Sequence, residues 1–164
     1  MAVLLNGDGY QGITAKEDAD LYAGLAGSGR LVLNVGRKME CEIIDNNTVR
    51  VYDGELISKG RRIHIDAGTW DDFTIPTGSQ GEIKYFTLGY RLYNDGGQQK
   101  CEAALKTDSN LPVYTEYDLR DGSAETYVSL YCIKQEGLNL TNITALYTNI
   151  SSLEDAWKQL GILG

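Results

Sequence analysis

His64 is the only histidine in the chain, and histidine is the usual general base of a hydrolytic triad. It lies between Ile63 and Ile65, so in a strand its side chain points to the face opposite theirs. The sequence contains no G-x-S-x-G motif and no reactive-cysteine signature that would supply a nucleophile. We therefore interpret His64 as a surface or inter-subunit residue, and we predict no catalytic residues.

Two adjacent carboxylates, Asp71 and Asp72, follow Trp70. A glycosidase needs two carboxylates beside its sugar, so this pair next to a ring is a candidate for that chemistry. Neighbouring residues of a strand point to opposite faces, however, and the two side chains would not meet one substrate. The pattern therefore does not favour an enzyme, and we expect a non-enzymatic protein.

No metal or cofactor site is predicted. Cys41, Cys101 and Cys132 are widely spaced and form no C-x-x-C pair, which argues against a zinc site and against a disulfide framework. Gly7-Asp8-Gly9 lacks the Gly-Lys-Ser/Thr of a phosphate loop, and Asp45-Asn46-Asn47 lacks the alternating ligands of a calcium loop. We interpret the cysteines as reduced, small apolar residues.

The chain contains 11 tyrosines and two tryptophans. Rings with polar tips suit protein interfaces and sugar faces, so Trp70 is a candidate glycan contact, with surface tyrosines around it. Ordinary packing of rings on both faces of a sheet is the competing interpretation. The tyrosines on or beside predicted strands are Tyr85, Tyr93, Tyr127 and Tyr131.

Composition excludes several classes of partner. The chain has 164 residues, which fits one domain, and 42% of them are hydrophobic. Its formal net charge is −8, and basic residues cluster only at Arg37-Lys38 and around Arg61-Arg62, so nucleic-acid binding is not expected. The sequence shows neither an apolar run that would span a bilayer nor a signal peptide, so we expect cytosolic synthesis without membrane insertion.

The elements that must position these residues are mostly strands. Period-2 alternation and turn residues recur about every ten residues, which is typical of an antiparallel sandwich or barrel. Asp53-Gly54 is expected to be a turn. We also expect Val128, Leu130 and Cys132 to face one way, and Tyr127, Tyr131 and Ile133 the other. The predicted strands are 30–35, 39–44, 48–52, 55–65 with a break at Lys59-Gly60, 73–75, 82–93, 100–106, an edge strand near 113–117, 125–135 and 138–147.

Helices are predicted at the two ends. Thr14 and Glu17 form a capping box, and Gly27 ends the helix that follows. Its apolar face, Leu21, Tyr22 and Leu25, must dock on the chain's own sheet or on a neighbouring subunit. The chain then divides into an N-terminal arm and short helix (1–29), a β-sandwich of jelly-roll type (30–150) and a short C-terminal helix (151–164).

Three motifs follow one another in the middle of the chain: G-R-x-I-x-I at 60–65, T-I-x-x-G-x-Q-G at 74–81 and Tyr90-Arg91-Leu92-Tyr93. Their order and spacing, with the segment upstream of them, resemble structural proteins of tailed phages and prophages of Gram-positive bacteria. The resemblance covers residues 9–106. It departs at Glu82-Ile83-Lys84, where the family often has a basic residue followed by Asp, and it ends after Lys106.

This resemblance implies a virion component of the tail or baseplate, made in the host cytoplasm, with no cofactor. It implies a homo-oligomer, with a trimer favoured, that also contacts other tail or baseplate proteins. The alternative hypothesis is a carbohydrate-binding module that contacts host cell-wall glycan through Trp70, and the two functions can coexist at a tail tip. The residues predicted to form the assembly interface are Leu4, Leu5, Tyr10, Leu21, Tyr22 and Leu25.

Overall fold

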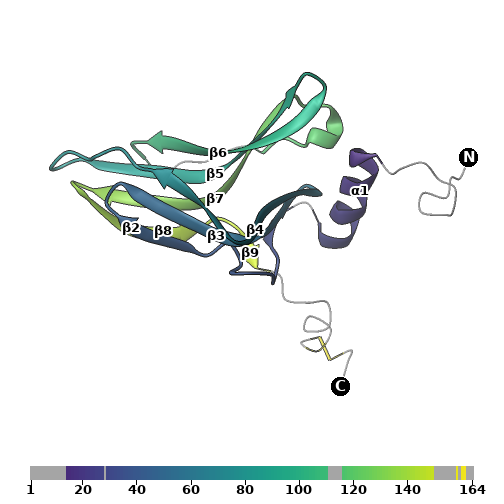
Figure 1. Ribbon diagram of the computed structural model, residues 1–164, viewed down its shortest axis with the longest axis horizontal. Helices are drawn as coiled ribbons and strands as arrows, with labels where there is room; N and C mark the ends of the chain where they lie inside the picture. The colour runs from purple at the N-terminus through teal and green to yellow at the C-terminus, as the bar shows by residue number, and fades with distance from the viewer. Residues whose placement is uncertain (1–13, 28, 111–115, 150–157, 159, 162–164) are drawn as a thin grey trace, which may run out of the picture.

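The computed structural model describes residues 14–27, 29–110, 116–149, 158 and 160–161. Within them, two β-sheets pack face to face and one short helix lies at the end of the sandwich (Figure 1). The β3 sheet contains β1 (Arg30–Val32), β2 (Cys41–Asp45), β3 (Thr48–Ser58), β4 (Arg61–Thr74) and β9 (Thr148–Asn149). The β5 sheet contains β5 (Ile83–Asp95), β6 (Gln98–Asp108), β7 (Glu125–Glu136) and β8 (Asn139–Ala145).

Strand pairing is antiparallel except between the short β1 and β9. In the β3 sheet, β4 pairs with β3 on one side, while β2 and β1 share its other side, beside the first and last parts of the strand. In the β5 sheet the order is β6-β5-β7-β8. Consequently β4 and β6 each lie at an edge of their sheet, and these two edges lie on the same side of the sandwich.

The hydrophobic core lies between the sheets. Alternate residues of each strand point inward, so Ile63 and Ile65 of β4 belong to the same core as Leu88 and Leu92 of β5. This burial is the main favourable contribution to folding. The largest completely buried side chains are Phe86, Met39, Leu56, Ile75, Leu88, Leu130 and Ile133.

Helix α1 (Ala15–Ala26) begins with the predicted capping box. The Glu17 backbone N–H donates to Thr14 Oγ1 at 3.2 Å, and the Thr14 N–H donates to a Glu17 carboxylate oxygen at 2.9 Å. The Thr14 N–H and the Thr14 hydroxyl both donate to the Glu17 carboxylate, and they hold the pKa of Glu17 below its usual value. The buried residue of the helix is Ala19, which packs on Gly60 in the β3–β4 turn.

The prediction of a turn at Asp53-Gly54 is wrong, because both residues lie within β3. The chain stays extended there because its backbone bonds to the β1–β2 connection: Asp53 O accepts from Met39 N at 3.1 Å. Glycine is required at 54 for packing instead, since a Cβ would lie 2.6 Å from Met39 N. The separate strand predicted at 73–75 is the last part of the long β4.

Strand β4 contains a large bulge at residues 66–69. Gly54 pairs with Ile65 and Tyr52 pairs with Trp70, so these four residues lie opposite Asp53 alone. They are exposed, and Thr69 Oγ1 donates to Asp66 O at 2.7 Å within the bulge. The bulge interrupts the free edge of the β3 sheet.

The two faces predicted for β7 are wrong beyond Leu130. Leu88 pairs with Tyr131 and Gly89 with Ser129, so Leu130 is an extra residue. A bulge of one residue reverses the alternation of the residues that follow. Tyr131 therefore lies in the same core as Val128 and Leu130 instead of opposite them.

The antiparallel sandwich with one short N-terminal helix is confirmed, and its jelly-roll form stays a prediction. Most of the predicted C-terminal helix at 151–164 and of the edge strand near 113–117 lies outside the described residues, in which α1 is the α-helical element. No helix of the part of the chain that the structure describes is long and apolar enough to cross a membrane.

Replacing Gly60 by alanine is expected to destabilise the protein more than replacing Gly96 by alanine. Both glycines have positive φ, 79° and 58°, so each change costs about 1 kcal/mol of backbone strain. Only at Gly60 does the new Cβ also overlap the carbonyl oxygen of Ala19, which forces α1 away. Urea unfolding of both variants measures the difference, and equal losses would show that α1 does not depend on Gly60.

Candidate functional site

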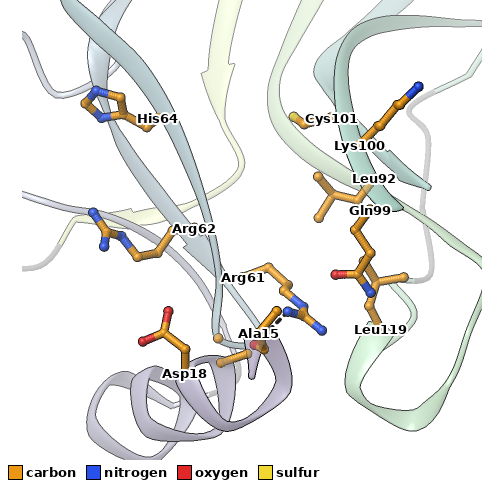
Figure 2. A pocket seen from close by; sticks show the side chains of 12 residues that line it. Ala15, Asp18, Arg61, Arg62, His64, Leu92, Gln99, Lys100, Cys101 and Leu119 are labelled. Carbon is orange, nitrogen blue, oxygen red and sulfur yellow. Dashed lines mark hydrogen bonds between the residues drawn. The ribbon is translucent and has the colours of Figure 1, made fainter. Parts of the chain in front are cut away.

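A cleft of about 410 Å³ lies between α1 and β4 on one side and β6 on the other (Figure 2). A second recess of about 610 Å³ adjoins it and shares Ala15, Arg61, Gln99 and Leu119 with it. Leu119 belongs to a short 3-10 helix, η1 (Leu119–Asp121), at the same end of the sandwich. The other residues that line the cleft are Asp18, Ala19, Gly60, Arg62, His64, Leu92, Lys100 and Cys101.

Arg61 is the cation at the centre of this cleft. It precedes Ile63 and Ile65 at the same inward-facing spacing of two residues, so the apolar column of β4 ends in a guanidinium group. Its Nη1 donates to Ala15 O at 2.8 Å, and its buried Nε has no hydrogen-bond partner in the described residues. In Figure 2 the side chain points toward Gln99 and Leu119. Arg61 therefore closes the core and links β4 to α1.

Arg62 and His64 lie on the outer face of the same strand and point away from β6 (Figure 2). Arg62 forms a salt bridge with Glu55 at 3.0 Å, and His64 lies 3.4 Å from Glu55 and 3.1 Å from Asp66. His64 is exposed, as its alternation with two buried isoleucines predicts. Its imidazole thus contacts surface carboxylates instead of pointing into the cleft.

A polar cluster lies at the core side of the cleft. The buried Tyr90 hydroxyl donates to Asp71 Oδ2 at 2.9 Å, and burial raises the pKa of Tyr90 well above its usual value. Cys101 pairs with Leu92 in register, so its thiol shares the inward face. Cys101 as a whole residue is exposed at the sheet edge, but desolvation of its inward-facing thiol, and then the Asp71 carboxylate, raise the pKa of this thiol to about 11. A thiol with so high a pKa is a poor nucleophile at neutral pH.

Asp71 and Asp72 point to opposite faces, as predicted from their adjacency. Asp71 accepts from Tyr90 inside the sandwich, whereas Asp72 forms a two-bond pair with Arg50 on the outer face, at 2.7 and 2.9 Å. The Arg50 guanidinium holds the pKa of Asp72 below its usual value. The two carboxylates therefore do not share one site.

Trp70 belongs to a second candidate surface, the aromatic–arginine patch, formed by Arg37, Arg50, Tyr52 and Trp70. The Arg50 guanidinium lies 4.2 Å from the Trp70 ring centroid, and Tyr52 meets that ring edge-on at 6.4 Å. Arg37 covers the Tyr52 ring at 3.3 Å. Trp70 keeps 48% of its surface exposed, so part of the indole remains available to a ligand.

Trp70 was predicted from the sequence as a candidate contact, whereas its three neighbours in the patch were not. Tyr52 faces Trp70 only because the bulge at 66–69 sets the β3–β4 register, and no residue pattern marks the length of that bulge. Counting equal numbers of residues from the Lys59-Gly60 turn is the usual way to find hairpin partners, and here it fails to pair Tyr52 with Trp70.

Of the residues predicted to form the assembly interface, Leu4, Leu5 and Tyr10 lie outside the described residues. Leu21 and Leu25 are 58% and 73% exposed on α1, so the chain's own sheet does not cover them. Tyr22 is half-buried, and its hydroxyl accepts from Arg62 Nη1 at 3.2 Å. The structure thus places the three helical residues at the surface, with only Tyr22 held against the sandwich.

Among the described residues, no three His, Cys, Asp or Glu side chains are grouped so that they could hold a metal ion. No family model, no curated protein and no solved structure matches this chain.

Cys101 is expected to react with a thiol reagent at pH 8 roughly a hundredfold more slowly than an unperturbed cysteine, because little of it is thiolate. Replacing Asp71 by asparagine removes a negative charge that raises the pKa of Cys101, so labelling should accelerate. Asp66→Asn, beside the outward-facing His64, is the matched control and should leave the rate unchanged. Peptide mass spectrometry measures each rate, and ordinary reactivity of wild-type Cys101 would contradict the assignment.

Proposed function

We propose that this protein is a non-enzymatic structural subunit of a phage or prophage virion, in the tail or baseplate, and that it works by self-association. The observation that supports this most directly is the exposed apolar surface of α1, where Leu21 and Leu25 face solvent. The motif order over residues 9–106 supports the virion assignment. A jelly-roll sandwich and a trimer are the forms that this assignment favours.

The contacts of α1 with the sandwich leave its leucines free. Ala15 O accepts from Arg61, Ala19 packs on Gly60, and Asp20 forms a salt bridge with Arg120 at 3.1 Å. These contacts are mostly polar and all lie on the side of the helix that faces the sandwich. A helix of 12 residues is marginally stable alone, so a partner that covers its outer side would stabilise it.

A second copy of the chain is the partner that fits this surface. Burying one leucine completely is worth about 1.5–3 kcal/mol, and each copy would contribute two. The segment that precedes Thr14 adds Leu4, Leu5 and Tyr10 next to the same helix in the sequence. Together these six residues form the proposed assembly interface, and other tail or baseplate proteins would bind elsewhere on the subunit.

Replacing Leu21 and Leu25 by serine is expected to lower the oligomer mass, because the change removes apolar area from the interface and leaves the core intact. Light scattering across a concentration series measures the mass. The matched control is Leu138→Ser, a leucine that is 54% exposed in the β7–β8 turn and lies outside the proposed interface. If the wild-type protein is oligomeric and the α1 variant has the same mass, the proposed α1 interface is wrong.

Recognition of cell-wall glycan through Trp70 is a second candidate function, and the half-exposed indole of the aromatic–arginine patch supports it. Sugar rings pack on aromatic faces, and the charged groups of Arg50 and Asp72 beside the indole can bond sugar hydroxyls. This function is compatible with a subunit at the tail tip.

Trp70→Ala is expected to abolish binding to purified Gram-positive cell wall, measured by co-sedimentation. Tyr117→Ala is the matched control, because Tyr117 is 58% exposed and lies near β7 in the other sheet, where its N–H bonds Thr126. If the wild-type protein binds no wall polymer, or if both variants lose binding equally, the glycan hypothesis is rejected.

A further inference from the structure

We propose that β6 pairs with β6 of a second copy, antiparallel, with Ala104 at the two-fold axis. This inference names a contact for the proposed self-association and rests on it. It joins two β5 sheets into one continuous sheet, a common way for exposed strands to recruit partners.

Strand β6 offers a long regular edge. Its 11 residues pair with β5 without a register shift, from Tyr85–Asp108 to Asp95–Gln98, and β6 pairs with no other strand among the described residues. Residues 98–103 are exposed. The other edges are less suitable: β4 is interrupted by the bulge at 66–69, and β8 has seven residues and a register shift against β7. An unpaired edge of this length is a template for another strand.

The outer face of β6 carries a self-complementary order of charges. Residues 100, 102, 104, 106 and 108 point to this face. Each of them pairs with a β5 residue that lies between two core positions of β5 and so points away from the core. With Ala104 on the axis, Lys100 lies opposite Asp108 of the second copy, and Glu102 lies opposite Lys106. All four charges of each strand then meet a charge of opposite sign.

Other registers of the same antiparallel pair bring like charges together. Moving the axis to Ala103 places Lys100 opposite Lys106 of the second copy, and moving it to Leu105 places Glu102 opposite Asp108. Like charges directly opposite each other destabilise a strand pair. The charges thus select one register, whereas charges that only protected an edge would need no such order.

The inner face of β6 is compatible with the same register. Ala103 lies opposite Leu105 of the second copy, which continues the apolar core across the contact; Leu105 already packs against that core in each chain. The proposed pairs would add to contacts that these charges already make within the chain: Lys100 bonds Asp95 at 2.5 Å, Glu102 bonds Arg91 at 2.9 Å, and the Lys106 ammonium lies 4.1 Å from the Tyr127 ring centroid. A two-fold contact joins two copies and no more, so a trimer would have to form through α1 instead.

A cysteine at position 107 tests the register, because Thr107 lies opposite Cys101 of the second copy. Residues directly opposite in an antiparallel pair have Cα atoms about 4.5–5.5 Å apart, within the range of a disulfide. We expect Thr107→Cys in the full chain to give a covalent dimer on prolonged oxidation at pH 9, which offsets the high pKa of Cys101. Mass spectrometry should then find the peptide that contains Cys101 joined to the peptide that contains position 107. Adding Cys101→Ser should abolish that link. Ala103→Cys, on the same face of β6, should give no 101–103 link between chains.

Charge reversal provides an independent measurement. Lys106→Glu places two acidic residues opposite each other at both symmetric positions, so the dimer should weaken roughly fivefold in Kd, and adding Glu102→Lys should restore it. Thermal unfolding of each variant in dilute solution checks that the fold is retained.

The outcomes separate this contact from the proposed function. An oligomeric wild type without the 101–107 link overturns the β6 contact and leaves self-association standing. Two results together support β6 pairing: the 101–107 disulfide forms, and adding Glu102→Lys to Lys106→Glu restores the Kd of the dimer. They do so even if the α1 variant keeps its mass. A wild-type protein that stays monomeric at every concentration overturns both proposals.

Discussion

The packing of the β3 sheet on the β5 sheet is the interaction on which the rest of the molecule depends. Each strand contributes alternate apolar side chains to this layer, and the layer ends where the inward position of β4 changes from Ile63 to Arg61. Because a guanidinium cannot continue an apolar core, the sheets separate there, and α1 and η1 occupy that end (Figures 1 and 2). The cleft is therefore a consequence of where the core stops.

A two-sheet sandwich leaves strand edges open, and this chain treats its two neighbouring edges differently. The edge at β4 is broken by the exposed bulge at residues 66–69, which prevents regular pairing with another strand. Strand β6 pairs with β5 without a register shift, and it carries both acidic and basic side chains along its outer face. This asymmetry leaves β6 as the regular edge of the pair, and it is there that we propose a second copy pairs.

Helix α1 is attached to the sandwich through polar contacts and one small residue. Arg61, Arg62 and Arg120 each reach the helix from the β domain, and Ala19 fits against Gly60 because glycine has no side chain. The leucines of the helix take no part in this attachment. The same amphipathic pattern that predicts a helix therefore creates an apolar surface outside the core, which is the physical basis of the self-association we propose.

The sequence alone determined the local features: the capping box at Thr14, the outward position of His64, and the alternation that gives an antiparallel sandwich. These features depend on hydrogen bonds and side-chain periodicity within a few residues. Only the tertiary structure decided that Asp53-Gly54 continues a strand, that Leu130 and residues 66–69 are bulges, that Tyr52 meets Trp70, and that β6 is an open edge. Strand order and register come from pairing between distant residues, and one inserted residue reverses every side chain beyond it.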